Sequence, residues 1–247
     1  MTGPTALSTT KLTSVFRSGV APIVALDGVD IELMAGEFTL LMGPSGSGKS
    51  TLLAALGGLQ PPTSGAVRFK DQSIWDLPST KLDRFRRENC GFVFQSGGLF
   101  DSLTALQQIA IPLTYFGYSK PEAIDKARHA LAEVDLADRQ ESLPVELSGG
   151  QNQRVAIARM LAKDPYLVFC DEPTSALDSH NGAVVAQLLR RAARKRNAMV
   201  LCVTHDDRLR PFADRILQIE DGRITADARP EASDNGPTHE RYEEGTT

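Results

Sequence analysis

The sequence predicts an α/β fold in which helices cover both faces of a mainly parallel sheet. Short apolar segments alternate with helical patterns along most of the chain, and the clearest are residues 167–170, 199–204 and 216–219. Uninterrupted apolar runs of this length are typical of strands that are buried on both faces. A glycine-rich loop also joins an apolar strand to a helix in the first quarter of the chain.

The N-terminal elements predict a second, antiparallel sheet beside the parallel one. Residues 11–33 carry apolar and polar residues in short runs, which predicts two strands joined by a turn at 19–22. Residues 37–42 (EFTLLM) predict a compact buried strand that leads into the glycine-rich loop. Residues 51–59 predict a helix, which glycines and prolines stop, and residues 65–69 predict a further strand.

The middle of the chain, residues 99–147, has a helical pattern. Ser119 and Glu122 stand at the spacing of a capping box, so we expect a helix that begins there and runs through Ala132. In the last third, residues 179–195 predict a helix between two buried strands, because its apolar residues fall on one face. The alternation of strand and helix therefore resumes after the helical middle.

The composition excludes several classes of protein. With 247 residues, of which 41% are hydrophobic and 23% charged, the chain is neither disordered nor collagen-like and has ample material for a core. Its 27 basic and 31 acidic residues give a formal net charge of −4, which argues against a dedicated DNA-binding protein, so we expect no nucleic-acid partner. Three widely spaced cysteines fit a reducing compartment better than a disulfide framework: Cys90, Cys170 and Cys202.

The sequence has neither the pattern of a membrane span nor that of a secretory signal. The longest apolar runs have five or six residues, whereas a spanning helix needs about 20. The first twelve residues carry one cation and no apolar stretch, so we expect no secretory signal there. Any role at a membrane is therefore expected to come through a partner.

The pattern of elements stops at residue 226. The segment 226–247 contains six acidic and two basic residues, which accounts for the whole formal charge, and almost no large apolar residue. We therefore expect one folded domain over residues 11–225 and a disordered acidic tail over 226–247.

The strongest motif is the glycine-rich loop GPSGSGKS at residues 43–50, which matches G-x-x-x-x-G-K-[ST] in full between a strand and a helix. Its glycines let backbone N–H groups curl around phosphate oxygens, and the helix directs its positive end at them. Lys49 is placed to neutralise β- and γ-phosphate charge, and the Ser50 hydroxyl to coordinate Mg²⁺. We expect the following residues to contact the phosphates: Gly43, Pro44, Ser45, Gly46, Ser47, Gly48, Lys49, Ser50 and Thr51.

Two acidic residues end the buried strand at 167–170. Asp171 and Glu172 are expected at the carboxyl edge of the sheet, where α/β proteins bind ligands. Asp171 suits a Mg²⁺ partner, and Glu172 suits a general base that polarises the attacking water. A strand that ends in two acids is common in structural roles, and the phosphate loop is what favours a functional role here.

A third motif, Leu147-Ser-Gly-Gly-Gln151, precedes a helical pattern, and its Ser148 and Gln151 have capping-box spacing. With this motif the sequence, over roughly residues 11–225, resembles the ATP-binding subunits of ABC transporters, in which LSGGQ is the signature. The resemblance implies a P-loop NTPase (RecA-like) core with an N-terminal antiparallel β subdomain and an inserted α-helical subdomain at about 97–150. It also implies ATP and Mg²⁺ as cofactors, and ATP hydrolysis coupled to transport.

The resemblance implies roles for further residues. Gln95 matches the Q-loop glutamine, which contacts Mg²⁺ or water and reports to the membrane subunit, and His205 matches the switch histidine that contacts the γ-phosphate. Phe16 stands where the family has an adenine-stacking aromatic residue, and the alternative for it is a core position. The implied catalytic residues are Glu172, His205, Lys49 and Gln95; the implied metal ligands are Ser50, Gln95 and Asp171; the further ATP contacts are Phe16, Ser148, Gly149, Gly150, Gln151 and, in the D-loop Ser175-Ala-Leu-Asp, Asp178.

Members of this family act as head-to-tail dimers with two ATP molecules between the subunits. Each ATP lies between the P-loop of one subunit and the signature of the other. The resemblance therefore implies a homodimer in which Ser148 serves the phosphates held by the partner's P-loop. Binding of ATP would close the dimer and hydrolysis would let it open.

Several stretches resemble the ATPases of lipoprotein-releasing, macrolide-export and glycolipid-export systems (the LolD, MacB and DevA type), among them residues 92–96, 103–113 and 203–207. This implies an FtsX/MacB-like transmembrane permease as partner, export or mechanotransmission of lipid, lipoprotein, peptide or drug, and a peripheral position on the cytoplasmic side of the inner membrane. A periplasmic adaptor is compatible with such a system. Gln107 and Gln108 replace the Glu-Asn pair of that group, in the segment that packs against the permease.

Alternatives stay open at this point. A cell-division-type ABC ATPase, paired with a permease-like scaffold, would keep the ATP site but transport nothing. A cytosolic ABC ATPase usually has coiled-coil insertions or two ATPase halves, and this sequence has neither. Apolar residues after the Q-loop form either a docking surface for the permease or the core of the helical subdomain: Leu99, Phe100, Leu103, Ile109, Leu113 and Phe116.

Overall fold

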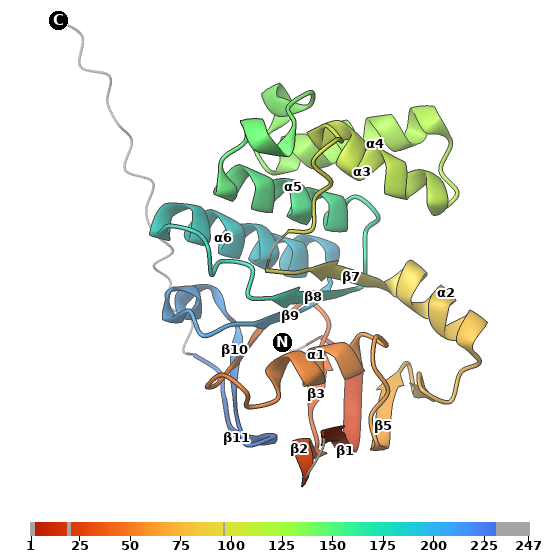
Figure 1. The fold of residues 1–247 in the computed structure, drawn as a ribbon, viewed down its shortest axis with the longest axis vertical. Helices are drawn as coiled ribbons and strands as arrows, with labels where there is room; N and C mark the ends of the chain where they lie inside the picture. Colours follow the sequence, from red (N-terminus) through yellow and green to blue (C-terminus); the bar gives the residue numbers. More distant parts are fainter. Residues whose placement is uncertain (1–2, 19–20, 96, 231–247) are drawn as a thin grey trace, which may run out of the picture.

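A six-stranded sheet forms the centre of the computed structural model, which describes residues 3–18, 21–95 and 97–230 (Figure 1). Its strand order is β11-β10-β4-β9-β8-β7, and all neighbours from β10 to β7 run parallel, whereas β11 pairs antiparallel with β10. The strands are β4 (Phe38–Met42), β7 (Cys90–Val93), β8 (Leu167–Asp171), β9 (Met199–Val203), β10 (Arg215–Glu220) and β11 (Arg223–Ala228). This arrangement confirms the predicted α/β class.

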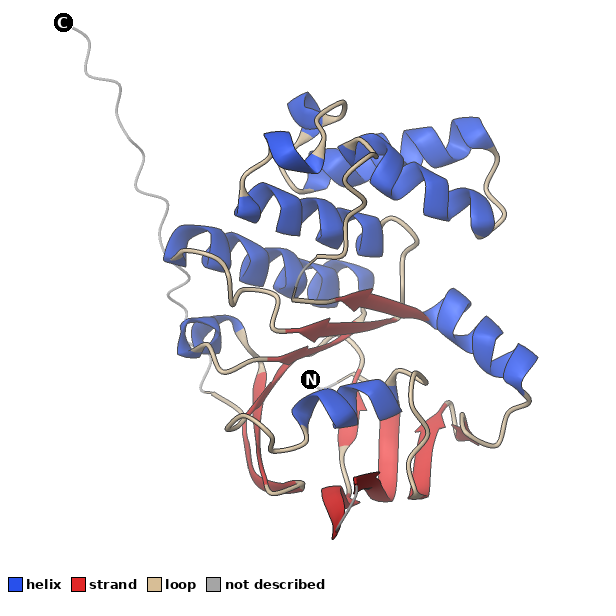
Figure 2. Cartoon of the chain, viewed as in Figure 1, coloured by secondary structure: helices blue, strands red, loops and turns tan. Residues whose placement is uncertain are grey.

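Both faces of the central sheet are covered, as Figure 2 shows. Leu40 belongs to the core on one face, which the sheet shares with α3 (Ala105–Tyr115), α4 (Lys120–Glu133), α5 (Gly149–Leu161) and α6 (Ser179–Arg196). Its neighbour Leu41 belongs to the core on the other face, which the sheet shares with α1 (Lys49–Leu56) and the N-terminal strands. Successive strand residues point to opposite faces, so strands buried on both faces have unbroken apolar runs.

The N-terminal strands form a second, antiparallel sheet, as predicted. Its order is β2 (Ala21–Val29), β1 (Thr5–Ser18), β5 (Ser64–Phe69) and β6 (Gln72–Ser73), and β3 (Glu32–Met34) also pairs with β1. β1 begins upstream of residue 11, where the sequence places the start of the domain. Two residues of the predicted turn, 19–20, lie outside the described residues.

Several elements were not predicted, among them three that have a weak sequence signal. The helix α2 (Ser79–Asn89) buries only Phe85, so its apolar face is too narrow to stand out. In β7, Gly91 interrupts the apolar run. Glycine is needed at this position, because a Cβ there would lie 2.7 Å from Met160 Cγ on α5. β11 is mostly exposed and polar. The predicted end of the domain at residue 225 falls inside β11, so the first three tail residues are a strand, and residues 231–247 lie outside the described part.

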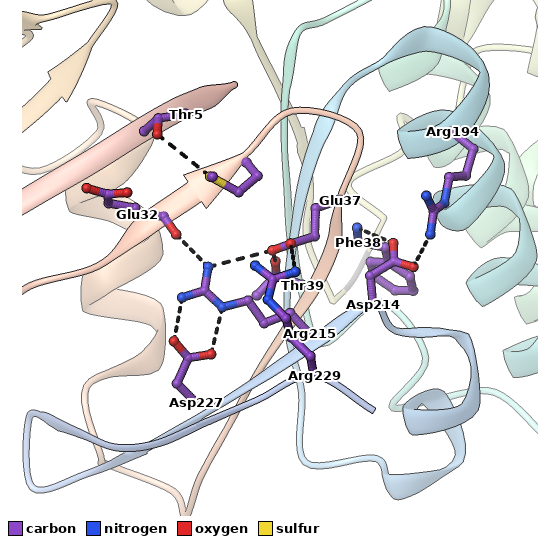
Figure 3. A network of polar contacts seen from close by, with 11 residues as sticks. Thr5, Glu32, Glu37, Phe38, Thr39, Arg194, Asp214, Arg215, Asp227 and Arg229 are labelled. Atoms are coloured by element: carbon purple, nitrogen blue, oxygen red, sulfur yellow. Dashed lines mark hydrogen bonds and ion pairs between the residues drawn. The ribbon is translucent and has the colours of Figure 1, made fainter. Parts of the chain in front are cut away.

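An ionic network holds β11 to the central sheet (Figure 3). Arg215 on β10, whose side chain is 9% exposed, donates from Nε and Nη2 to the two carboxylate oxygens of Asp227 at 2.7 and 2.6 Å. Glu37 accepts hydrogen bonds from Thr39 at 2.9 Å and from Arg229 at 2.5 Å, and it lies 3.6 Å from Arg215. The hydrogen bonds from Arg215 hold the pKa of Asp227 below its usual range. The strand β11 is therefore joined to the sheet by charge as well as by its ladder.

Replacing Arg215 with Met is expected to lower the free energy of unfolding by about 1–2 kcal/mol, because its hydrogen bonds to the half-exposed Asp227 and to the carbonyl oxygen of Glu32 are lost. Since the folded pKa of Asp227 is depressed, the stabilisation is present at neutral pH and disappears as the pH falls through that folded pKa. Urea titrations at neutral and acid pH measure both effects. Arg223→Met is the matched control, because its pair with Asp27 is exposed (69% and 43%) and should contribute less than about 1 kcal/mol.

Candidate nucleotide site at the carboxyl edge of the sheet

Four neighbouring parallel strands bring the predicted site residues to one edge of the sheet. β4 leads into the glycine-rich loop, β9 into His205, β8 into Asp171 and Glu172, and β7 into Gln95. Parallel strands end on the same side, so residues far apart in the chain meet there. In the order β4-β9-β8-β7, the strand that leads into the phosphate loop lies next to the strand of His205. The strand of His205 separates it from the strand that ends in the two acids.

The loop after β4 has a backbone that depends on glycine. Gly48 caps α1 in the left-handed region, with φ 102°, and a Cβ there would lie 2.2 Å from the carbonyl oxygen of Ala25. Lys49 is 9% exposed, and its Nζ donates to the carbonyl oxygens of Gly43 at 2.9 Å and Pro44 at 2.7 Å. The ammonium group therefore lies along the inside of the loop, where phosphate charge would be neutralised.

The Ser47 hydroxyl is buried in the same loop and has no hydrogen-bond partner within the described part of the chain. A buried polar group without a partner is rare and costs free energy. A phosphate oxygen would supply the missing acceptor. This observation fits the loop to phosphate independently of the motif.

Ser50 and Asp171 form the link between the loop and β8. The Ser50 hydroxyl donates to Asp171 Oδ1 at 3.2 Å, and burial raises the pKa of Asp171, although the hydrogen bond from Ser50 opposes the shift. These are hard oxygen donors of the kind that Mg²⁺ prefers. Among the described residues, no group of three or more His, Cys, Asp or Glu side chains forms a self-sufficient metal site. Mg²⁺ bound here would therefore need phosphate oxygens to complete its coordination.

Asp171→Asn is expected to raise the melting temperature at neutral pH. The pKa of Asp171 is higher in the folded chain than in the unfolded chain. Stability is therefore lost as the pH rises from the unfolded pKa through the folded pKa, and the full loss is present at pH 7. The amide removes that cost and the repulsion from Glu172, but it weakens the hold on Mg²⁺. Thermal melts with and without Mg²⁺-nucleotide measure both effects, and a lower melting temperature without nucleotide would contradict the expectation.

Glu172 and His205 contact each other across β8 and β9. His205 Nδ1 lies 2.8 Å from Glu172 Oε1, and the Thr204 hydroxyl donates to Glu172 Oε2 at 3.3 Å. Glu172 has φ 49°, a left-handed backbone that costs a non-glycine residue about 1–3 kcal/mol. A backbone hydrogen bond from its N–H to Val203 at 2.9 Å holds it there. The carboxylate is thus fixed in direction by both strands.

The signature motif forms the start of α5. Ser148 caps the helix, its Oγ accepting from the Gln151 N–H at 3.2 Å, and the Gln151 side chain accepts from the Ser148 N–H at 2.9 Å. The predicted capping box is therefore confirmed. α5 packs in the core on one face of the central sheet, whereas α1, which follows the phosphate loop, packs in the core on the other face (Figure 1).

Two residues of the predicted site stand apart from these contacts. Phe16 on β1 is 37% exposed and lies opposite Ile23 on β2, so it is a surface aromatic and not the core residue of the alternative reading. The same strand β2 brings Ala25 against Gly48 of the phosphate loop. Gln95 is exposed in the turn after β7, and within the described residues it makes no hydrogen bond to Ser50 or Asp171.

The comparison with protein families agrees with this geometry. A family model described as ABC transporter matches residues 26–175. This chain belongs to the ABC transporter family. It is an ATP-binding cassette, an ABC ATPase, with the predicted P-loop core, antiparallel β subdomain and helical subdomain.

Curated relatives and solved structures place the cassette within the family. The lipoprotein-releasing system ATP-binding protein LolD of Anaeromyxobacter dehalogenans is 45% identical over 92% of this chain and 97% of its own length. The macrolide export ATP-binding/permease protein MacB of Marinobacter nauticus is 39% identical over 93% of this chain, which spans 37% of that protein. The dimeric, post-hydrolysis structure of the ATP-binding cassette MJ0796 bound to ADP and Pi has a TM-score of 0.83 and 38% identity, covering 90% of this chain and 98% of that one.

The apolar residues after the Q-loop divide between core and surface. Ile109 and Leu113 are buried in the helical core, as the alternative reading expected, whereas Phe100 is 64% and Phe116 37% exposed. Within the described ranges, every helix falls short of the length and apolarity that a membrane span needs. Phe100, which precedes α3, and Phe116, which ends it, are therefore exposed aromatic residues.

The Gln107-Gln108 pair has a structural explanation. Gln107 forms a capping box with Thr104 at the start of α3, accepting from its N–H at 2.9 Å. Gln108 is buried, and its amide bonds both the N–H and the carbonyl of Phe100, at 3.1 and 2.6 Å. The departure from Glu-Asn thus keeps the cap and fixes the loop that exposes Phe100.

Proposed function

We propose that this chain is the ATP-hydrolysing motor subunit of an export-type ABC system, acting as a head-to-tail homodimer bound to a transmembrane permease on the cytoplasmic side of the inner membrane. The contact between Glu172 and His205, beside the linked Ser50 and Asp171, carries the proposal. It combines a phosphate cradle, oxygen ligands and an oriented base at one edge of the sheet.

Each side chain has a distinct part in hydrolysis. Lys49 and the loop N–H groups would bind the phosphates, and Ser50 and Asp171, with Gln95, would hold Mg²⁺, which would neutralise charge on the transferring phosphoryl group. Glu172 orients the attacking water and takes its proton. Thr204 and His205 keep the carboxylate aimed, and His205 also faces the γ-phosphate. The exposed ring of Phe16 stacks on the adenine.

Opposite positions of α1 and α5 support a composite site. Within one chain, the P-loop helix and the signature helix lie in the cores on opposite faces of the sheet. A second subunit that brings its own Ser148, Gly149, Gly150 and Gln151 to the phosphates, with Asp178 beside them, resolves this separation. MJ0796, which this cassette resembles over nearly its whole length, has been solved as a dimer.

The relatives support export as the purpose of the motor. LolD is named for lipoprotein release and MacB for macrolide export, and the MacB chain is described as both ATP-binding and permease. We infer that the cassette drives a permease of the same kind, with lipid, lipoprotein, peptide or drug as cargo. The exposed Phe100 and Phe116 offer that permease an apolar surface.

Ser148→Arg tests the composite site. The bulky cation at the start of α5 should abolish hydrolysis by the dimer, because it enters the partner's phosphate site, yet it should leave ATP binding by the single chain unchanged. Equilibrium binding of a fluorescent ATP analogue at low protein concentration and steady-state ATPase assays at high concentration separate the two effects. Reduced ATP affinity of the monomer would contradict the proposal, and Ser142→Arg serves as a control on the preceding loop.

A further inference from the structure

A second polar cluster lies next to the catalytic pair. Asp206 follows His205, its side chain is 11% exposed, and it accepts hydrogen bonds from Arg208 Nε and Nη2, both at 2.8 Å, and from the Thr174 hydroxyl at 2.9 Å. Burial alone would raise the pKa of Asp206, but the hydrogen bonds from Arg208 and Thr174 hold it below its usual range. Asp206 is therefore an ionised anchor between the segments that follow β8 and β9.

The same guanidinium also reaches the D-loop, in the segment that follows β8. Arg208 Nη1 donates to the Ser179 hydroxyl at 3.2 Å, and Nη2 also donates to the carbonyl oxygen of Leu177 at 3.4 Å. A planar guanidinium that bonds a carboxylate with two nitrogens and two further acceptors fixes their relative positions in a way that a lysine cannot. Arg208 therefore ties the D-loop to the loop that carries His205.

The D-loop is linked to the signature helix of the same chain through Asn181 on α6. Asp178 Oδ1 accepts from the Asn181 N–H at 2.9 Å and Oδ2 accepts from its side-chain amide at 2.7 Å. The Asn181 side chain lies so close to Gly150 that a Cβ on the glycine would be 2.4 Å from its Oδ1. Asp178 of the D-loop is therefore connected through Asn181 to the start of α5.

The other end of this series of contacts is Glu172. The Asp206 N–H donates to the Thr204 hydroxyl at 3.0 Å, and that hydroxyl donates to the Glu172 carboxylate at 3.3 Å. The series thus runs from the proposed base through Asp206 and Arg208 to the D-loop and the signature. The Arg208 side chain bonds both the Asp206 carboxylate after His205 and the Leu177 carbonyl oxygen of the D-loop directly.

We propose that Arg208 is a positioning residue, which holds the D-loop and, through Asn181, the signature in register with the Glu172–His205 pair. The proposal rests on the function proposed above, since register matters for hydrolysis at a site shared by two chains. Within the described part of the chain, Arg208 has no hydrogen bond or ion pair with the phosphate loop, so we expect it to contribute to turnover and not to ATP binding by a single chain.

The test compares Arg208→Met with Arg210→Met. Arg210 lies in the same short helical segment, Asp207–Phe212, is equally exposed at 45%, and pairs only with the exposed Asp207 among the described residues, so its variant controls for loss of charge. We expect Arg208→Met to lower kcat about tenfold to a hundredfold, as a displaced catalytic group does, with KM for ATP equal to that of the control. Amide hydrogen exchange across residues 175–182 should be faster in Arg208→Met alone.

Equal kcat in the two variants, or equal exchange across residues 175–182, overturns the proposal. The exchange is measured without turnover, so it decides the positioning role even where the wild-type chain hydrolyses no ATP, a result that would instead overturn the proposed function. Should the Met variant fail to fold, Arg208→Lys, which keeps the charge without the planar fork, must give the same split between kcat and KM.

Discussion

Replacing Glu172 with Gln is expected to lower ATP turnover by about 10²–10⁴-fold, the range that a general base contributes, and to leave ATP bound between two subunits. Gln has nearly the same shape and keeps an oxygen that can accept from Thr204, so the strained backbone at φ 49° is undisturbed. The amide cannot take a proton from water. The variant should therefore accumulate as an ATP-bound dimer.

Single-turnover ATPase assays and size-exclusion chromatography with ATP or ADP measure the two effects. Glu220→Gln is the matched control, because Glu220 also ends a parallel strand at this edge, on β10, and is exposed. The control should hydrolyse ATP at the wild-type rate and stay monomeric after turnover. Wild-type turnover in Glu172→Gln would disprove the assignment of the base.

Lys49→Ala is expected to weaken ATP binding by about 10- to 100-fold, since hydrogen bonds to a charged group contribute about 1.5–3 kcal/mol each. The Lys49 ammonium already lies inside the loop, bonded to Gly43 and Pro44, so it is positioned before nucleotide binds. Titration calorimetry with ATP measures the loss. Lys120→Ala is the control, because Lys120 is also the first residue of a helix, α4, but is exposed. Unchanged ATP affinity in Lys49→Ala would contradict the assignment of residues 43–50 as the phosphate-binding loop.

The buried strands were predictable because their apolar runs are unbroken, and the two predicted capping boxes, at Ser119 and Ser148, follow from spacing alone. Elements that short-range interactions determine could therefore be predicted from the local sequence pattern. The strand β7 and the helix α2 were missed because tertiary packing, with Gly91 against Met160, determines them more than propensity does. The strand β11 was not predicted for the same reason, because a tertiary contact, the pairing of Asp227 with Arg215, helps to hold it on the sheet.

The site shows the same division. The motifs gave Lys49, Asp171 and Glu172 by residue type and order, and the structure brings Ser50 to Asp171 and His205 to Glu172. Thr204 and Asp206 were missed as members of the site, because their importance lies in contacts across strands. The only sequence signal for them is their position on either side of His205.

The head-to-tail site can be tested directly by cross-linking. On the Glu172→Gln background, Ser45→Cys and Gly149→Cys place one thiol on the P-loop and one on the signature; Ser45 is exposed, and a side chain at Gly149 meets nothing within 4 Å. The three native cysteines are buried, and burial raises the pKa of the Cys90 thiol to about 12 and raises those of Cys170 and Cys202 as well, so they should not react.

With a short thiol cross-linker, the paired variant should form a covalent dimer in the presence of ATP and little with ADP, and each single-cysteine variant should stay monomeric on a denaturing gel. This result would place the P-loop of one chain against the signature of the other. Cross-links that form equally without ATP, or only within one chain, would contradict the account.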